Sequence, residues 1–220
     1  MMEYYMRGLG LCGRAVLAAV LMAGSVTAQQ KGTFTDRRDK QTYKTVKIGK
    51  QTWMAENINY QTESGSWCYN DSASYCKKYG RLYDWKTATT VCPKGWKLPS
   101  REDWGSLVQA VGGKRTPDED GNIYWHGAGK KLKSKSGWNN RDDGESGNGT
   151  DDYGFSALPG GYRYPDGSLG INSAGNYGYW WTTTEVGFNE LVSYWYINDD
   201  MDDDFGDKSD GFSVRCLADT

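Results

Sequence analysis

The residues best suited to hold a ligand lie in one glycine- and tyrosine-rich segment, which reads YGFSALPGGYRYPDGSLGINSAGNYGYW from residue 153 to residue 180. Rigid rings beside short amide and carboxylate side chains are typical of recognition loops, because rings give contact area at low entropic cost. We therefore predict a ligand-binding surface on the loop 159–178 and the adjacent strands. Its candidate residues are Tyr162, Arg163, Tyr164, Asp166, Asn172, Asn176, Tyr177, Trp181 and Glu185. In the alternative interpretation, half or more of these rings fill the core.

Two of these candidates, Asp166 and Glu185, are carboxylates that suggest acid–base chemistry. A glycosidase needs two carboxylates at a set separation across a cleft, and the sequence does not define that separation. Nucleophilic catalysis has less support, because the chain has one histidine, His126, in a segment without periodicity. We expect His126 to be a solvated loop residue, and we predict no catalytic residues.

Two acidic stretches, DDGESGNGTDD and DDMDDDFGDKSD, are rich in the oxygen ligands that calcium prefers. Neither has EF-hand spacing, so the expectation is no cofactor, with calcium kept as an alternative. Zinc is not expected, because one histidine and bonded cysteines leave too few ligands. The second stretch is otherwise a soluble acidic turn that keeps strand edges from pairing with neighbours.

Four cysteines, Cys68, Cys76, Cys92 and Cys216, follow the N-terminal leader, and they allow three disulfide connectivities. In the last strand, GFSVRCL, alternation places Cys216 on the buried side and Arg215 on the other side. Cys216 is the natural partner for Cys92, and that bond would close a loop of about 125 residues. Cys68 and Cys76 would then close a short loop.

Two helices must position this cysteine framework. Asp84 is suited to cap the first helix, which Pro93 ends just after Cys92. Ser100 and Asp103 have the spacing of a capping box for the second helix, which a Gly-Gly pair ends. An apolar stripe with helical spacing follows this cap. It consists of Trp104, Leu107, Val108 and Val111.

Strands are predicted near both ends of the mature chain. YKTVKIGKQTWMAENI alternates around Gly49-Lys50, which favours a hairpin with a type II′ turn. YWWTTTE, VSYWYIN and GFSVRCL are three further strands, in the first of which one of Trp180 and Trp181 should point inward. Residues 29–41 are predicted to be a flexible segment, and residues 112–153 a long irregular excursion.

The first 28 residues have the features of a secretory signal peptide: arginines, the apolar run AVLAAVLMAG, and small residues up to Ala28. The chain has 26 basic and 28 acidic side chains, of which two basic and one acidic lie in this leader. The mature chain therefore keeps 24 basic and 27 acidic side chains, with a net charge near −3. That balance gives no electrostatic footprint for nucleic acid. We expect a secreted or cell-surface protein with no membrane insertion after cleavage.

The pattern W-x-x-A-x-x-x-C-x-x-G-x-x-L-x-S-x-E from Trp85 to Glu102, followed near the C-terminus by FSVRC, resembles the frame of a C-type-lectin-like domain. More specifically, six stretches resemble the Fibrobacter succinogenes major paralogous domain family of exported bacterial proteins. They are VKIGKQTWMAENINY, CYNDSASYCKKYGRLYDWKTA, CPKGWKLPSREDW, GFSALPGGYR, YWWTTTE and GFSVRC. The resemblance implies one disulfide-stabilised α+β domain over residues 42–220. In it, two helices flank small antiparallel β-sheets with long irregular loops.

The sequence departs from sugar-binding C-type lectins at the calcium site. The Glu-Pro-Asn or Gln-Pro-Asp triplet and the Trp-Asn-Asp triplet of those lectins do not occur in this chain. Calcium-dependent sugar binding is therefore not implied. We expect a secreted, non-catalytic module that recognises an extracellular glycan or a surface protein through its aromatic loops. The alternatives are an enzyme acting on polysaccharide through loop carboxylates and a structural display scaffold.

Overall fold

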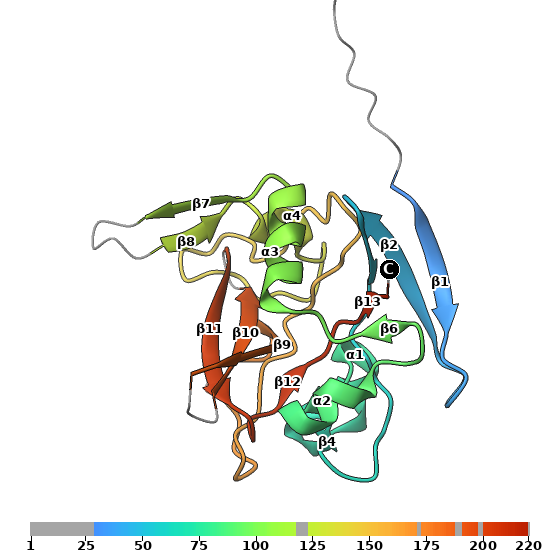
Figure 1. Cartoon of the computed structure of the whole chain (residues 1–220). Coiled ribbons are helices and arrows are strands. Elements are labelled where there is room, and N and C mark those ends of the chain that lie inside the picture. Colours follow the sequence, from blue (N-terminus) through green and yellow to red (C-terminus); the bar gives the residue numbers. More distant parts are fainter. Residues whose placement is uncertain (1–28, 118–122, 171–172, 188–190, 198–199, 220) are drawn as a thin grey trace, which may run out of the picture.

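The computed structural model describes residues 29–117, 123–170, 173–187, 191–197 and 200–219, which form an α+β architecture (Figure 1). The five-stranded sheet consists, in spatial order, of β1 (Lys31–Thr35), β2 (Thr42–Ile48), β3 (Gln51–Met54), β13 (Leu217–Ala218) and β6 (Trp96–Lys97). The six-stranded sheet consists of β11 (Met201–Asp207), β10 (Leu191–Ile197), β9 (Gly178–Val186), β12 (Phe212–Ser213), β5 (Leu82–Tyr83) and β4 (Ser66–Trp67). A separate ribbon pairs β7 (Lys114–Pro117) with β8 (Ile123–His126).

The helices are short. They are α1 (Ala73–Tyr79), α2 (Trp85–Val91), α3 (Arg101–Ala110) and α4 (Gly129–Leu132), with a 3₁₀ turn at Tyr69–Asp71. Figure 1 shows β9, β10 and β11 on one side of the molecule and β1 and β2 on the other, with the segment from β12 to β13 running between them.

The two predicted helices are confirmed with their caps. The Asp84 carboxylate accepts a hydrogen bond from the Thr87 amide at 2.7 Å at the start of α2. At the start of α3, the Ser100 hydroxyl accepts from the Asp103 amide at 3.1 Å, and the Asp103 carboxylate accepts from the Ser100 amide at 2.9 Å. This capping box satisfies two amide groups that would otherwise lack partners in the first turn.

The predicted hairpin is also confirmed, with Ile48 paired to Gln51 and a φ of 59° at Gly49, the first central turn residue. The prediction of a flexible segment at 29–41 is wrong, because β1 pairs with β2 along its whole length. An ion pair of 2.7 Å between Arg38 and the buried Asp36 then holds the connecting turn. Backbone pairing orders this mostly polar segment, together with one apolar contact between Phe34 and Trp96, whose ring centroids are 5.3 Å apart.

The core has two parts, separated by the β9–β10 region of the six-stranded sheet. Trp180 packs against Trp104 of α3 in one cluster, with ring centroids 5.8 Å apart, and Trp181 packs against Phe212 in the other, at 4.3 Å. The prediction that only one of the two neighbouring tryptophans points inward is therefore wrong, since both are fully buried. Strand β9 lies between β10 and β12, and at Trp180 and Trp181 it is covered on both faces by the two clusters.

The predicted alternation in the last strand is wrong for the same reason. Residues 211–217 are all buried, and Arg215 has no exposed surface. Its guanidinium donates hydrogen bonds to Asn57 Oδ1 at 2.9 Å and to the Phe155 carbonyl at 2.6 Å. Burial lowers the pKa of Arg215 to about 9, which still leaves it charged at neutral pH. These bonds connect the final segment of the chain to Asn57 and to Phe155, which precedes the predicted binding loop 159–178.

Both predicted disulfides are present. Cys92, at the end of α2, is bonded to Cys216, and their Cα atoms are 5.9 Å apart. Cys68 is bonded to Cys76 across a separation of 8 residues. The first bond joins the bend between α2 and α3 to the final segment of the chain.

Three ordered regions differ from the sequence prediction. The segment between Cys68 and Cys76, predicted as a loop, contains the start of α1. The predicted irregular excursion contains the ribbon of β7 and β8 and the short helix α4. The acidic stretch near residue 204, predicted as a turn, forms β11, an edge strand paired with β10 along seven residues.

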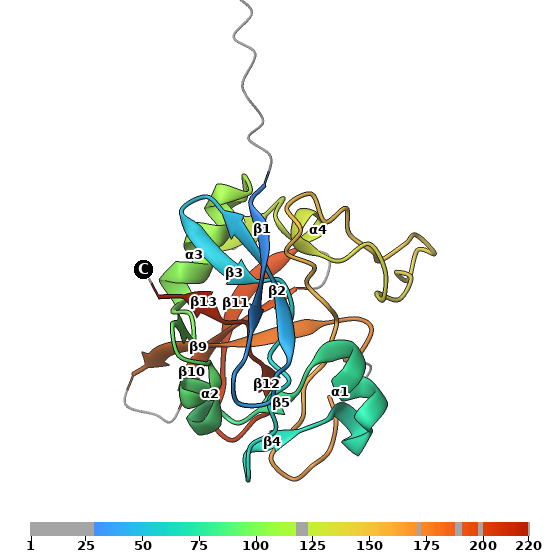
Figure 2. The same ribbon diagram turned by 90° about the vertical axis from the view of Figure 1, so that its right-hand side faces the viewer.

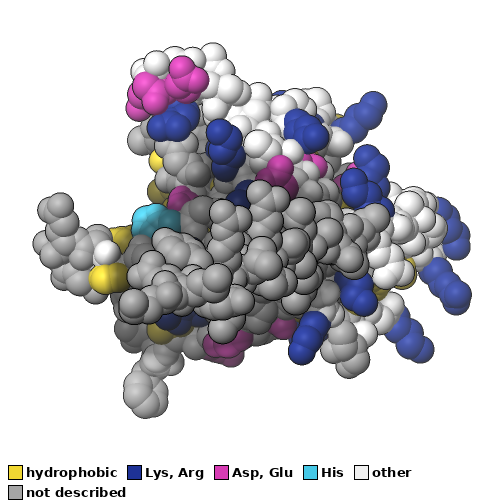
Figure 3. Space-filling model, turned by 90° about the horizontal axis from the view of Figure 1, so that it is seen from above, with side chains coloured by type: hydrophobic (Ala, Val, Ile, Leu, Met, Phe, Trp, Pro, Cys, Tyr) yellow, Lys and Arg dark blue, Asp and Glu magenta, His cyan; other side chains and the backbone are white. Residues whose placement is uncertain are grey.

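Charged side chains are unevenly distributed. From above, lysine and arginine side chains gather toward the side of the molecule that holds β1 and β2 (Figure 3). Lys44 and Lys47 of β2 are exposed there. Acidic side chains concentrate instead on β11, at the other side of the fold. No helix in the described ranges is long and apolar enough to cross a membrane.

Candidate functional site

The predicted binding loop runs along the outside of the molecule to a turn near β4 (Figure 2). Asp166 closes this turn, because its carboxylate accepts bonds from the Ser168 hydroxyl at 2.6 Å and the Ser168 amide at 2.8 Å. Before the turn, the Arg163 amide and carbonyl pair with Gly211 at 3.1 Å and 2.7 Å. The loop is thus fixed to the residue that precedes β12.

This pairing aligns two tyrosines with the strands of the six-stranded sheet. Tyr162 and Tyr164 are two residues apart in extended backbone, so they lie on one side, and Arg163 lies on the other side, over the Trp67 ring at 4.6 Å. Gly170 makes room for the Tyr162 ring, since an added Cβ would lie 2.1 Å from it. The local sequence therefore presents both phenols to the sheet.

The result is a tyrosine groove, with a volume of about 210 Å³. It is lined by Tyr162, Tyr164, Tyr179, Tyr194, Phe205, Gly206, Asp210 and Phe212. Tyr162 contacts Tyr164 and Tyr179 with its ring centroid 4.9 Å from each, and Tyr179 lies 5.8 Å from Tyr194. Gly206 admits the Tyr194 ring at the edge strand, because a Cβ there would be only 3.1 Å from it. The phenols form a continuous, partly exposed aromatic wall.

The groove contains neutral hydroxyls and one carboxylate. The Tyr162 and Tyr164 hydroxyls are hydrogen bonded at 2.6 Å. Burial raises the pKa of Tyr162, Tyr179 and Tyr194 well above that of free tyrosine, so these phenols stay protonated. Burial also raises the pKa of Asp210 to about 6, opposed by its backbone hydrogen bond to Asp207. Asp210 therefore changes charge just below neutral pH.

The other predicted site residues lie outside this groove. Arg163 stacks on Trp67, Asp166 closes its own turn, and the Asn176 amide oxygen accepts a bond from Asn139 at 3.1 Å. Tyr177 borders the groove, since its ring stacks on Tyr179 at 5.8 Å.

Three further candidates have other positions. Trp181 is wrong as a ligand contact, because it is fully buried and its indole donates to the Tyr83 carbonyl. Asn172 lies outside the described residues. Glu185 forms an exposed ion pair of 2.7 Å with Lys208 at the end of β9.

Sequence reasoning missed the residues that the strands and the acidic stretch contribute. Tyr179 and Tyr194 are in strands that were identified, but the face they share becomes evident only with the register of β9 and β10. Asp210 and Phe205 lie in the stretch interpreted as an acidic turn. The available signal was the period-two spacing of Tyr194 and Tyr196.

Neither carboxylate of the predicted acid–base pair lines the groove, whose one acid is Asp210. Hydrogen bonds from Ser168 lower the pKa of Asp166, whereas a general acid needs a raised pKa. Among the described residues, no group of three or more His, Cys, Asp and Glu side chains is arranged to hold a metal ion. His126 is exposed as predicted, but it lies on β8 instead of a loop, with Nδ1 3.3 Å from Asp200.

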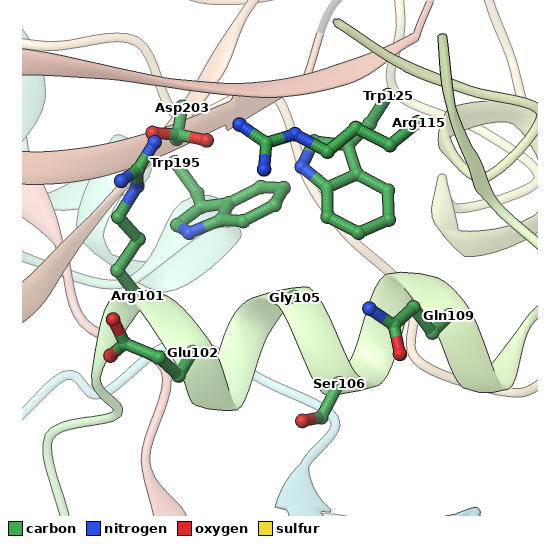
Figure 4. Close-up of a pocket in the computed structure, with 9 residues that line it drawn as sticks. All are labelled: Arg101, Glu102, Gly105, Ser106, Gln109, Arg115, Trp125, Trp195 and Asp203. Carbon is green, nitrogen blue, oxygen red and sulfur yellow. The ribbon is translucent and has the colours of Figure 1, made fainter. Parts of the chain in front are cut away.

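A second groove lies on the opposite face of the same sheet, between α3 and β11 (Figure 4). It has a volume of about 310 Å³ and is lined by two tryptophans and by polar side chains of α3. No residue of this groove was predicted as a site residue, because its lining comes from α3, β7, β8, β10 and β11, which are brought together only by the fold.

A comparison with protein families identifies the family of this α+β chain. The family model of the Fibrobacter succinogenes major domain matches residues 46–218, and the protein belongs to this family. The resemblance predicted from the sequence is therefore confirmed at the level of the family. No curated protein matches the chain, and no solved structure matches it.

Proposed function

We propose that the protein is an exported, non-catalytic module that binds carbohydrate in the tyrosine groove. Support for export comes from the two disulfides, which persist in oxidising compartments, and from the signal-peptide pattern of residues 1–28. The cysteine frame and the α+β architecture are compatible with a C-type-lectin-like fold, which we include in the proposal. The family itself does not define a ligand.

The observation that carries the proposal is the combination of partly exposed rings and one semi-buried carboxylate in the same groove. Aromatic faces give flat apolar contact, and hydroxyl groups of a sugar would pair with Asp210 and the phenols. A volume near 210 Å³ is below the roughly 300 Å³ of the smallest pockets for drug-sized ligands. The groove therefore suits a single sugar unit at the end of a longer chain.

The proposal is tested by screening a glycan array at several calcium concentrations and measuring the affinity for hits by calorimetry. Tyr164→Ala should weaken binding about tenfold, the value of one aromatic contact of roughly 1.5 kcal/mol. Tyr164 is 42 % exposed, so its loss should leave the fold intact. Tyr124→Ala is the matched control, since Tyr124 is 38 % exposed and lies outside the groove.

Equal affinity in Tyr164→Ala and the wild type would refute the role of the groove, as would binding to surface proteins with no glycan bound. Formation of a product from a bound glycan would distinguish the alternative of an enzyme from a binding module. Turnover that disappears in Asp166→Asn or Glu185→Gln would replace a binding function with catalysis.

A further inference from the structure

The groove between α3 and β11 is separate from the tyrosine groove. Neighbouring residues of a strand point to opposite faces, so Tyr194 faces the tyrosine groove and Trp195 lines this second groove. Figure 4 shows α3 on one side, with Glu102, Gly105 and Gln109, and Trp195, Trp125 and Arg115 on the other. A ligand here would touch none of the eight residues that line the tyrosine groove.

The floor of this groove contains an unsatisfied donor. Trp195 is 1 % exposed and stacks on Trp104, with ring planes 22° apart. Its indole N–H has no hydrogen-bond partner among the described residues, and buried polar groups without partners are uncommon. The Trp104 indole also lacks a partner, but Trp104 does not line the groove. An acceptor atom of a ligand would satisfy the Trp195 donor.

Two charged side chains of the groove form no ion pair with a described residue, although the charge of Arg115 opposes the rise that burial causes in the pKa of Asp202. Arg101 is bound to Asp203, with Nε 2.5 Å from the carboxylate. Arg115 and Glu102 form no ion pair with any described residue, and Arg115 extends over the groove with its guanidinium 5.9 Å from the Trp125 ring. The groove thus offers one cation and one anion to a ligand.

Gly105 keeps the groove open. It lies inside α3, where glycine is less favourable than alanine. An added Cβ would meet only a Trp125 carbon, at 3.8 Å, which is an ordinary contact. Internal packing therefore does not require glycine, and the space above it is available to a ligand.

We propose that this groove is a second ligand site that binds a carboxylate-bearing sugar, a hexuronate. Its carboxylate pairs with Arg115, a ring or hydroxyl oxygen accepts from the Trp195 indole, and its hydroxyls donate to Glu102. An acidic peptide would also satisfy Arg115, but a second acid would be repelled by Glu102, whereas sugar hydroxyls are suited to it. The site goes beyond the proposed function, because it needs none of the tyrosine-groove residues.

The test is an NMR titration of the disulfide-bonded protein that follows the tryptophan indole N–H resonances. Galacturonate, which carries a single carboxylate, should shift the Trp195 resonance, and the neutral sugar galactose should bind at least tenfold more weakly. Arg115→Gln should weaken uronate binding at least tenfold. Arg37→Gln is the control, because it removes one exposed arginine outside the groove.

Gly105→Ala separates binding from folding. It should raise or preserve the melting temperature while weakening uronate binding, because its methyl group enters the groove. An unmoved Trp195 resonance, or wild-type affinity in Arg115→Gln or Gly105→Ala, would overturn the site. A tri-glutamate peptide that binds as tightly as the uronate would overturn the sugar assignment. None of these outcomes depends on Tyr164, so the proposed function would stand or fall separately.

Discussion

Removal of the Cys92–Cys216 disulfide should destabilise the protein more than removal of Cys68–Cys76. The first bond joins residues 124 apart, and the second joins residues 8 apart. The loop-closure relation gives losses of about 5 kcal/mol and about 2.6 kcal/mol in the free energy of unfolding. Because domains are stable by only about 5–15 kcal/mol, the paired variant Cys92→Ala/Cys216→Ala should approach the limit of folding.

Urea unfolding followed by tryptophan fluorescence measures both losses, since five tryptophans of the described residues are less than 2 % exposed. The variant Cys68→Ala/Cys76→Ala serves as the matched control, with the same chemistry and a short loop. The predicted gap between the two variants is about 2.4 kcal/mol. Equal losses, or a larger loss in the short-loop variant, would refute the inference that the long crosslink holds the fold together.

Three further predictions concern single residues. The pKa of Asp210 is raised on folding to about 6, so its contribution to stability is complete below about pH 4 and is lost as the pH rises through 6. The melting temperature of Asp210→Asn should therefore exceed that of the wild type at pH 8 and match it at pH 4. A difference that stays constant with pH would show that the Asp210 carboxyl does not cause the pH dependence. Arg215→Lys loses the bond to Asn57 and should lower the free energy of unfolding in urea by about 2–3 kcal/mol; a loss under about 0.5 kcal/mol would contradict the role of the guanidinium. In Gly49→Ala the new methyl group meets a positive φ of 59° and a contact of 3.1 Å to Ala110, so the free energy of unfolding should fall by about 1–2 kcal/mol. The loss should exceed that in Gly95→Ala, where φ is 86° but an added Cβ meets nothing. The reverse order would assign the loss to φ alone.

The elements that could be predicted from the sequence are those whose signals are local. Asp84, Ser100 and Asp103 define helix starts within one turn of chain, and Gly49 defines a two-residue turn. The disulfide pairing was predicted because Pro93 places Cys92 at a helix end.

The elements that were missed depend on contacts distant in sequence. Strand β11 has the composition of a loop, and it is ordered by backbone pairing with β10, which sequence composition does not encode. Arg215 does not follow the alternation of buried and exposed residues, because neighbouring elements cover both faces of its segment. Its hydrogen-bond partner Asn57 lies 158 residues away in the chain. Only part of the predicted site lies in one groove for the same reason: Tyr162 and Tyr164 share a face locally, whereas Asp210, close to β12 in the chain, joins them only in the folded structure.

Strand β10 is the element that links the two grooves. Tyr194 lines one groove and Trp195 lines the other, and a shift of one residue in register would exchange the two faces. The register is held on both sides, by β9 with an irregularity between Val192 and Tyr194 and by β11 along seven residues. Ligand-contacting side chains on a strand so fixed are placed more precisely than those on loops. The part of each groove that the sheet does not fix is the loop or helix that faces β10, so we expect substitutions there to change the ligand preference of the proposed sites without disturbing the sheet.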